Sequence, residues 1–304
     1  MFRILGRSVD VSDGVLEHYF SILKGKKNAR YLMNKDSMPG RIKTCREILK
    51  ECHLCERRCG VNRFEKRGVC GVKDTKVSSF FVHMGEEPEL IPSFTIFFAG
   101  CNLKCVFCQN WDISQNPKAG KVVSKEKVSR SISKTDARNV NWVGGDPIPN
   151  ICFILDVLNI LDTNLPQVFN SNMYFSLEAL ELLDGVVDLY LSDFKYGNSK
   201  CGKRLSKVKD YFEIVSRNHK LVNKNTDMII RHLILPGHYE CCTVPIIMWI
   251  AEHLDVSRVK MNIMAQYHPE HNAWDYEELQ DSIDMKHYFR AKDLAKEYGI
   301  PLSE

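Results

Sequence analysis

The sequence predicts an α/β fold, a partial (β/α)6 barrel with parallel strands, preceded by a small helical and cysteine-rich N-terminal module. Beyond residue 94, short β-branched and aromatic runs alternate with helical patterns in six successive repeats, which is typical of a parallel sheet. The 304 residues also suffice for one barrel-sized domain and a small extra module. We therefore expect a helical segment over 1–50, a cysteine-rich metal-binding module over 51–92 and the barrel domain over 93–304.

The expected elements follow from the periodicity of apolar residues. Two helices precede the barrel, over 13–24 and 41–51. The strands are expected over 95–99, 139–143, 167–172, 186–193, 228–235 and 259–267. Helices are expected between them over 151–158, 177–183, 211–220 and 244–254. A last helix over 284–298 is expected to bury Met285, Phe289 and Tyr298, among others. In such a barrel the site lies at the C-terminal ends of the strands.

Three cysteines follow the first expected strand in a short loop. Cys101, Cys105 and Cys108, hereafter the trio, have the spacing C-x3-C-x2-C. Three thiolates on one loop hold three corners of a cubane iron–sulfur cluster and leave the fourth iron open to a ligand. The alternative is a zinc knuckle, but a closed zinc site usually has a fourth protein ligand, and no cysteine or histidine follows before Cys152. The loop therefore predicts a cluster that acts on a bound ligand.

Four further cysteines lie upstream, with the spacing C-x2-C-x3-C-x10-C. Cys52, Cys55, Cys59 and Cys70, hereafter the quartet, form a complete ligand set for either zinc or a fully ligated iron–sulfur cluster. We expect this site to fold a small module, with electron delivery as a second option. Three arginines either offset the thiolate charge or are solvated: Arg57, Arg58 and Arg63. The remaining thiols are expected to pack as small apolar residues: Cys152, Cys201, Cys241 and Cys242.

Polar or glycine residues end each later strand of the expected barrel, where a ligand lying across the strand ends would meet them. Paired glycines let a backbone approach a ligand closely, while carboxylates, cations and amides supply charge and hydrogen bonds. Simpler explanations exist, because Asn170 and Asn172 also suit a surface turn and Asp193 and Lys195 also suit an ion pair. The candidate ligand-binding residues are Gly144, Gly145, Asp146, Asn172, Asp193, Lys195, Arg231, Gln266 and His268.

Two residues of the fifth strand are charged or titratable within an otherwise apolar run. A cation such as Arg231 needs either a buried anionic partner or a ligand carboxylate. His232 points to the opposite face, because strand side chains alternate, and is expected to be a structural histidine with satisfied hydrogen bonds.

Five segments occur in an order that resembles a known family: CQNWDIS, WVGGDP, YLSDFKY, RHLILPGH and NIMAQYHP. With the trio and Phe107, they resemble the radical S-adenosylmethionine (SAM) superfamily, in the branch similar to pyruvate formate-lyase activating enzyme and among members with an N-terminal four-cysteine segment. The resemblance implies a 4Fe-4S cluster on the trio, with SAM bound at its open iron. Asp146 stands where the family usually has glutamate to hold the amino group of SAM, so this contact is expected to be looser or made by backbone.

The resemblance also implies an activity. Such an oxidoreductase-type enzyme takes an electron from a donor of the ferredoxin or flavodoxin type and cleaves SAM. The resulting 5′-deoxyadenosyl radical then abstracts a hydrogen atom from the substrate. In this branch the expected substrate is a protein or peptide, in an activase-like role. No catalytic acid–base residue is assigned, because the cofactor carries the chemistry. The alternative is an iron–sulfur electron-transfer or metal-binding protein without turnover of its own, which would show four ligands at the second cluster instead of three.

Composition argues against several other classes of protein. Hydrophobic residues make up 44% and charged residues 26%, and no stretch approaches the ~20 apolar residues of a membrane helix. The first residues lack the apolar core of a signal peptide, so a cytoplasmic protein with no membrane partner is expected. The net charge is only +4 with scattered lysines, so no nucleic acid partner is expected. In such a chain, twelve cysteines indicate metal ligands.

Overall fold

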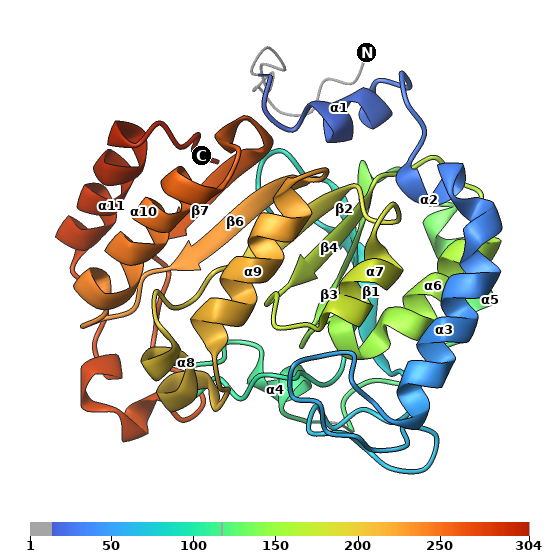
Figure 1. The fold of residues 1–304 in the computed structure, drawn as a ribbon, viewed down its shortest axis with the longest axis horizontal. Coiled ribbons are helices and arrows are strands. Elements are labelled where there is room, and N and C mark those ends of the chain that lie inside the picture. The colour runs from blue at the N-terminus through green and yellow to red at the C-terminus, as the bar shows by residue number, and fades with distance from the viewer. Residues whose placement is uncertain (1–13, 117, 304) are drawn as a thin grey trace.

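The computed structural model describes residues 14–116 and 118–303. In that part of the chain a seven-stranded sheet holds its strands in the order of the sequence, β1 to β7 (Figure 1). The strands are β1 Val77–His83, β2 Ser93–Phe98, β3 Asn139–Gly144, β4 Gln167–Ser171, β5 Leu189–Asp193, β6 Asp227–Leu233 and β7 Val259–Met264. Strands β2 to β7 are parallel, which confirms the predicted partial barrel of six parallel strands.

Helices connect the parallel strands and cover the sheet (Figure 1). The longer ones are α1 Glu17–Leu23, α3 Met38–Lys50, α5 Lys125–Ile132, α6 Ile151–Ile160, α7 Leu177–Leu183, α8 Ser199–Ser206, α9 Tyr211–Asn223, α10 Val244–His253 and α11 Met285–Glu297. Short helices are α2 Arg30–Met33 and α4 Trp111–Ser114, and a π-helix, η3, covers Tyr239–Thr243. The seven expected helices are all present. No helix in the described residues is both long and apolar enough to cross a bilayer.

Strand β1 was not expected from the sequence. It lies in the segment assigned to the cysteine-rich module and pairs antiparallel with β2. Phe81 and Val82 are 46% and 45% exposed, so this edge strand shows no clean alternation of buried and exposed residues. The same sheet therefore continues from the barrel strands into the segment that follows the quartet.

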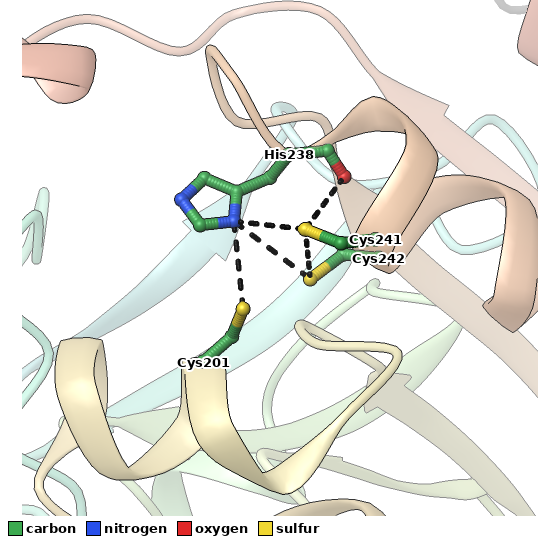
Figure 2. A group of neighbouring side chains, drawn as sticks. All are labelled: Cys201, His238, Cys241 and Cys242. Atoms are coloured by element: carbon green, nitrogen blue, oxygen red, sulfur yellow. Dashed lines mark hydrogen bonds between the residues drawn. The ribbon is translucent and has the colours of Figure 1, made fainter.

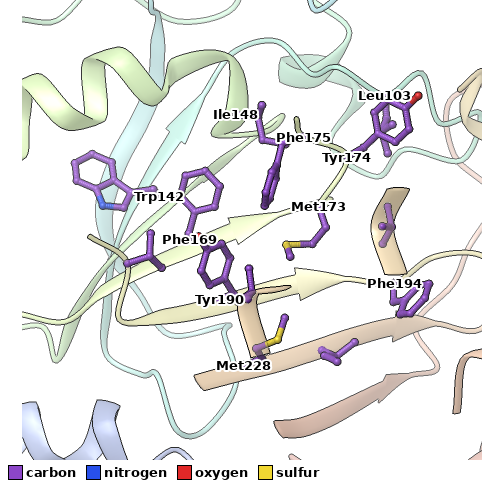
Figure 3. Packing of buried hydrophobic residues seen from close by; sticks show 14 of the residues in the cluster. Leu103, Trp142, Ile148, Phe169, Met173, Tyr174, Phe175, Tyr190, Phe194 and Met228 are labelled. Atoms are coloured by element: carbon purple, nitrogen blue, oxygen red, sulfur yellow. The ribbon is translucent and has the colours of Figure 1, made fainter. Parts of the chain in front are cut away.

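One face of the sheet carries a ladder of large apolar side chains from neighbouring strands. Trp142 pairs in register with Phe169, Phe169 with Tyr190, and Tyr190 with Met228 (Figure 3). All four are at most 2% exposed. Burying one such side chain stabilises the fold by about 1.5–3 kcal/mol. This face packs into the main core under the connecting helices.

The opposite face forms a second core. Val168, Leu189, Leu191 and Ile229 alternate with the residues of the ladder and pack against Tyr19 of α1 and its neighbours. Because strand side chains alternate, this second face continues toward the C-terminal strand ends through the positions of Asn170, Asp193 and Arg231. Helix α1 therefore covers this second face at one end of the sheet, and the candidate residues lie on the same face at the C-terminal ends of the strands.

Helix α11 is present, but its buried face differs from the expected one. Met285, Phe289 and Tyr298 are 46%, 58% and 43% exposed, whereas Ala291 and Ala295 are fully buried. Two alanines one turn apart let a helix approach its neighbour closely, and they set the face that packs. The expectation that the large apolar residues of this helix are buried was wrong for those three.

Candidate functional site

The trio loop begins directly after β2, at a glycine hinge. Gly100 has φ +90°, and a Cβ there would lie 2.4 Å from Val72 and 2.7 Å from the backbone oxygen of Cys70. Both the backbone angle and the close approach therefore require glycine. The backbone N–H of Cys101 also donates to Cys70 O at 3.2 Å. The trio loop thus packs directly on the last cysteine of the quartet.

Each sulfur of the trio has a polar partner. Asn172 Nδ2 lies 3.6 Å from Cys101 Sγ, and the backbone N–H of Leu103 lies 3.4 Å from the same atom. Ser206 Oγ lies 2.9 Å from Cys105 Sγ, and Ser114 Oγ lies 3.1 Å from Cys108 Sγ. Hydrogen bonds to ligand sulfurs are one of the means by which proteins set the potential of an iron–sulfur cluster.

Burial raises the pKa values of two thiols of the trio, Cys101 and Cys105. Burial raises the pKa of Cys101 well above its ordinary value, and the nearby Asp146 and the other trio thiols raise it further. Burial also raises the pKa of Cys105 to about 11, against the lowering effect of the Lys195 ammonium. Thiols held protonated in this way become ligands when a metal supplies the positive charge that stabilises the thiolate.

The two glycines that end β3 pack against the trio loop. A Cβ on Gly144 would lie 2.0 Å from the backbone nitrogen of Phe98, and one on Gly145 would lie 2.2 Å from Gly100 O. Gly144 also has φ +117°. The backbone of these two glycines lies against that of Phe98 and Gly100 and leaves no room for a side chain, so both positions require glycine.

Asp146 is buried and accepts hydrogen bonds through both carboxylate oxygens. Oδ1 accepts from the backbone N–H of Ile148 and Oδ2 from that of Asn172, both at 2.9 Å. Burial raises the pKa of this carboxyl to about 7, and the two backbone donors lower it only in part. The side chain therefore ties the β3 and β4 ends together in this structure, and both of its oxygens are engaged within the protein.

Asn172 reaches the trio loop from the end of β4. Besides Cys101 Sγ, its Nδ2 donates to Asn102 Oδ1 at 2.7 Å, and its Oδ1 accepts from the backbone N–H of Tyr174 at 3.0 Å. Asn170 and Asn172 are 7% and 4% exposed, so neither is a surface turn residue. Asn102, which sequence reasoning did not single out, is fully buried in the same contact.

Asp193 and Lys195 form an ion pair at the end of β5, with 2.8 Å between Oδ2 and Nζ. The backbone N–H of Lys195 donates to the hydroxyl of Tyr211 at 2.8 Å, which fixes the strand end against α9. Burial favours the neutral amine, but Asp193 and the neighbouring Cys105 outweigh it and raise the pKa of Lys195. The pair expected as the simpler explanation is therefore present, and its cation faces the trio.

Arg231 has a buried anionic partner within the chain. Its Nε lies 2.6 Å from Glu87 Oε1 and its Nη2 lies 2.7 Å from Glu87 Oε2 and 2.5 Å from Glu86 Oε2. Burial would raise the pKa of Glu87, but Arg231 and the amide of Asn262 hold it below its ordinary value. Of the two interpretations of Arg231, this structure shows the buried anionic partner, and the guanidinium is already engaged before any ligand binds.

The neighbouring His232 is structural, as expected. It is 1% exposed, with Nδ1 2.8 Å from Phe194 O and Nε2 2.9 Å from Thr243 Oγ1. Burial lowers the pKa of this imidazole to about 4.

Gln266 and His268 follow β7, which ends at Met264, earlier than expected. Both are exposed. Gln109, the residue after the trio, joins them to the trio loop: its Nε2 lies 3.2 Å from Gln266 O and 3.1 Å from His268 Nδ1. The structure therefore brings candidates from the ends of β3, β4, β5 and β7 to the trio loop.

The quartet lies beside the trio loop, and a buried arginine contacts two of its sulfurs. Arg63 is 3% exposed, and its Nη1 lies 3.8 Å from Cys52 Sγ and 3.7 Å from Cys70 Sγ. Arg57 instead donates to Asn102 O at 2.8 Å, and Arg58 binds Glu56 and Glu178. Of the three arginines considered, Arg63 lies against two sulfurs of the quartet, Arg57 fastens the segment to the trio loop, and Arg58 makes surface ion pairs.

The other thiols are not all inert packing. The neighbouring thiol of Cys152 and burial raise the pKa of the Cys45 thiol. Cys241 is exposed, and together with Cys201 and Cys242 it surrounds His238. Cys201 and Cys242 are buried in the hydrophobic core, as expected, whereas Cys241 is exposed and does not pack there; α8 and η3 bring all three beside His238.

Comparisons with known proteins agree with this geometry. The sequence profile of the Radical SAM superfamily matches residues 95–250. An uncharacterised protein of Methanocaldococcus jannaschii is 48% identical over 276 residues, 86% of this chain and 79% of that protein. The pyruvate formate-lyase 1-activating enzyme of Escherichia coli K12 is 26% identical over 159 residues, 47% of this chain and 61% of that enzyme.

Solved structures are more distant. Streptococcus suis SuiB bound to S-adenosylmethionine has a TM-score of 0.49 and 15% identity, and the match covers 66% of this chain and 47% of SuiB. A domain of a pyruvate-formate lyase-activating enzyme from Bacteroides vulgatus has a TM-score of 0.43 and 15% identity, over 54% of this chain and 96% of that domain. The match with SuiB thus covers less than half of that chain's length.

Proposed function

Because this chain belongs to the Radical SAM superfamily, we propose that its trio holds a 4Fe-4S cluster and that it is an enzyme which reductively cleaves SAM. The observation that carries this proposal is the trio loop itself. Its three thiols lie at the C-terminal end of the first parallel strand, and polar groups that follow β4, β5 and β7 reach the same loop, as does Ser206 of α8. Three cysteines on one loop leave one iron open, as a cluster that binds its substrate requires.

The residues around the trio fit such a cluster. Two of the three thiols are buried, and each sulfur has a hydrogen-bond partner. Lys195 places a cation beside Cys105, which favours its thiolate. When bound, the cluster would supply one electron to SAM and so yield methionine and a 5′-deoxyadenosyl radical that removes a hydrogen atom from the substrate.

The chain's own residues would bind and orient SAM and exclude water. We assign close backbone approach to Gly144 and Gly145, and polar contacts to Asn172, Lys195 and the exposed Gln266. His268 adjoins Gln266 and joins this set. Asp193 would position the ammonium of Lys195, and Asp146 would hold the strand ends in place.

Arg231 is better assigned a positioning role than a contact with the SAM carboxylate, because Glu86 and Glu87 already neutralise it.

We further propose a class of substrate, a type of electron donor and a role for the quartet. Relatives named as pyruvate formate-lyase-activating enzymes support a protein or peptide as the hydrogen donor. An electron donor of the ferredoxin or flavodoxin type would reduce the cluster. The quartet would form a closed site, with zinc or a second iron–sulfur cluster, in a module that supports the trio loop. The buried Arg63 supports this assignment, because four thiolates need a nearby cation.

The electron paramagnetic resonance spectrum of the reduced cluster tests the open iron. Protein purified and reconstituted anaerobically should change its spectrum when SAM is added, because SAM binds the iron that lacks a cysteine. Cys105→Ser should lose this signal, while Cys152→Ser should keep it. An intact cluster signal that SAM leaves unchanged would instead favour an electron carrier with four protein ligands.

A further inference from the structure

A second group of metal-binding side chains lies outside the trio and the quartet. Cys201, His238, Cys241 and Cys242 place one potential ligand atom each within 4.8 Å of all the others. Figure 2 shows the three sulfurs gathered around one ring nitrogen, Nδ1 of His238. This Nδ1 lies 3.6 Å from Cys201 Sγ, 3.4 Å from Cys241 Sγ and 4.0 Å from Cys242 Sγ. The two neighbouring sulfurs lie 3.8 Å apart.

These separations match the edges of a tetrahedral zinc site. Zn–S and Zn–N bonds of about 2.3 and 2.05 Å, at tetrahedral angles, place two sulfurs about 3.8 Å apart and a sulfur about 3.6 Å from a nitrogen. The S–S distance between Cys241 and Cys242 is 3.8 Å, the S–N distances are 3.4–4.0 Å, and every other pair of ligand atoms lies within 4.8 Å. The group therefore encloses the space for a single ion, whereas a cubane cluster would hold its ligands farther apart.

The orientation of His238 is a second, independent observation. The ring is buried, and its other nitrogen, Nε2, has no hydrogen-bond partner among the described residues. That nitrogen lies 3.6 Å from Glu278 Oε1, and Glu278 is in turn bound by Arg204. Metal-bound histidines commonly direct their second nitrogen to a carboxylate, which fixes the ring and its tautomer. Here the ring presents Nδ1 to the three thiols and Nε2 to a carboxylate.

Two loops that follow neighbouring strands supply the ligands. Cys201 lies in the first turn of α8, which begins after β5, and the backbone N–H of Cys201 donates to Asn198 Oδ1 at 2.8 Å. Cys241 and Cys242 lie in the π-helix η3, after β6. The extra residue in a π-helical turn commonly marks a functional position. Asn198 Nδ2 also donates to Cys241 O at 2.8 Å, so both sides of the group are fastened together.

We propose that Cys201, His238, Cys241 and Cys242 bind one zinc ion in a closed structural site. Three thiolates and one imidazole form a common ligand set for structural zinc. The ion would lock the loop after β5 to the loop after β6. The other end of α8 reaches the trio loop, because Ser206 Oγ contacts Cys105 Sγ and Ser206 O accepts the backbone N–H of Lys104 at 3.0 Å. This zinc would therefore stabilise the position of α8 beside the trio loop without taking part in the chemistry.

Metal analysis of the full chain tests the site. The double variant Cys201→Ala/Cys242→Ala should contain one zinc fewer per chain than the parent after purification with zinc, and its iron content should be unchanged. Cys152→Ala removes a thiol outside the group and should keep the parent's zinc. Equal zinc content in the double variant and the parent would overturn the proposal. Because the trio holds the proposed iron, loss of zinc with retained iron is separate from any failure of the radical function.

A measurement on the unaltered chain covers the case in which the double variant does not fold. Cys241 is exposed, so its free thiol should react readily with iodoacetamide. In the zinc-loaded protein we expect Cys241 to react at least tenfold more slowly than after a chelator has removed the ion, as followed by peptide mass spectrometry. Equal rates before and after chelation would refute a metal at this site. A disulfide between any two of the three cysteines in anaerobically purified protein would also refute it.

Discussion

Replacing Arg231 by methionine should strongly destabilise the fold, because it removes one side of a buried ion pair. The guanidinium makes contacts of 2.6 and 2.7 Å with Glu87 and of 2.5 Å with Glu86. The Arg231 side chain is 17% exposed, and those of Glu86 and Glu87 are 5% and 1% exposed. Methionine keeps most of the aliphatic bulk, so the main change is the loss of the charge.

The expected magnitude follows from this burial. Removing one partner of a buried ion pair costs roughly 3–5 kcal/mol, because the remaining charge stays buried without compensation. Two carboxylates remain here, and protonation of one of them limits the loss, so we expect about 3 kcal/mol. The double variant Arg231→Met/Glu87→Gln should recover about 1–2 kcal/mol of that loss, because coupled neighbours are not additive.

Urea unfolding followed by tryptophan fluorescence measures these free energies in a chain with four tryptophans. All variants should be compared in the same metal state. A loss below about 1 kcal/mol, or a double variant less stable than Arg231→Met, would refute the reasoning. A stable Arg231→Met protein with much weaker SAM binding would restore the alternative in which this cation binds the SAM carboxylate.

Three further predictions follow from close contacts and buried charges. Gly145→Ala should prevent normal iron loading, because its Cβ would lie 2.2 Å from the backbone oxygen of Gly100, the hinge of the trio loop. The control is Gly40→Ala in α3, where an added Cβ meets nothing within 4 Å. This variant should load iron normally, and its free energy of unfolding should rise by about 0.5–1 kcal/mol. The pKa of Asp146 rises from 3.8 to about 7 on folding, so between these values the folded chain holds a proton that the unfolded chain releases. The free energy of unfolding, measured in urea, should therefore fall as pH rises from about 4 to 7. In Asp146→Asn this dependence on pH should be weaker. Arg63→Met should weaken metal binding by the quartet about tenfold in a chelator competition, whereas Arg58→Met, which breaks surface ion pairs, should not.

Much of the fold could be predicted because the parallel strands are short apolar runs. Five of the six keep nearly every residue buried, so their hydrophobicity is visible without knowledge of their neighbours. Strand β1 lies at the sheet edge, where Phe81 and Val82 are exposed, so its apolar residues follow no buried-strand pattern. Helix α8 was not expected from the sequence, because Gly202 argues against a helix. The fold requires glycine there, since a Cβ would lie 2.4 Å from Tyr211.

The candidate site was partly visible for a related reason. The trio and the quartet are local spacings, so the sequence displays them directly. The partners of Arg231 are distant, since Glu87 precedes it by 144 residues, and only the folded register brings them together. The same holds for Cys201 and His238, which are 37 residues apart and have no motif spacing. Non-local ion pairs and ligand sets of this kind depend on which loops the strand order makes neighbours.

Reductive cleavage of SAM tests the central claim most directly. The anaerobically reconstituted full chain, incubated with SAM and dithionite, should release 5′-deoxyadenosine and methionine in equal amounts. Cys101→Ser and Cys105→Ser should release neither, whereas Cys152→Ser should match the parent. A parent protein with a fully assembled cluster that forms no 5′-deoxyadenosine would contradict the assignment of the trio as a radical-generating site.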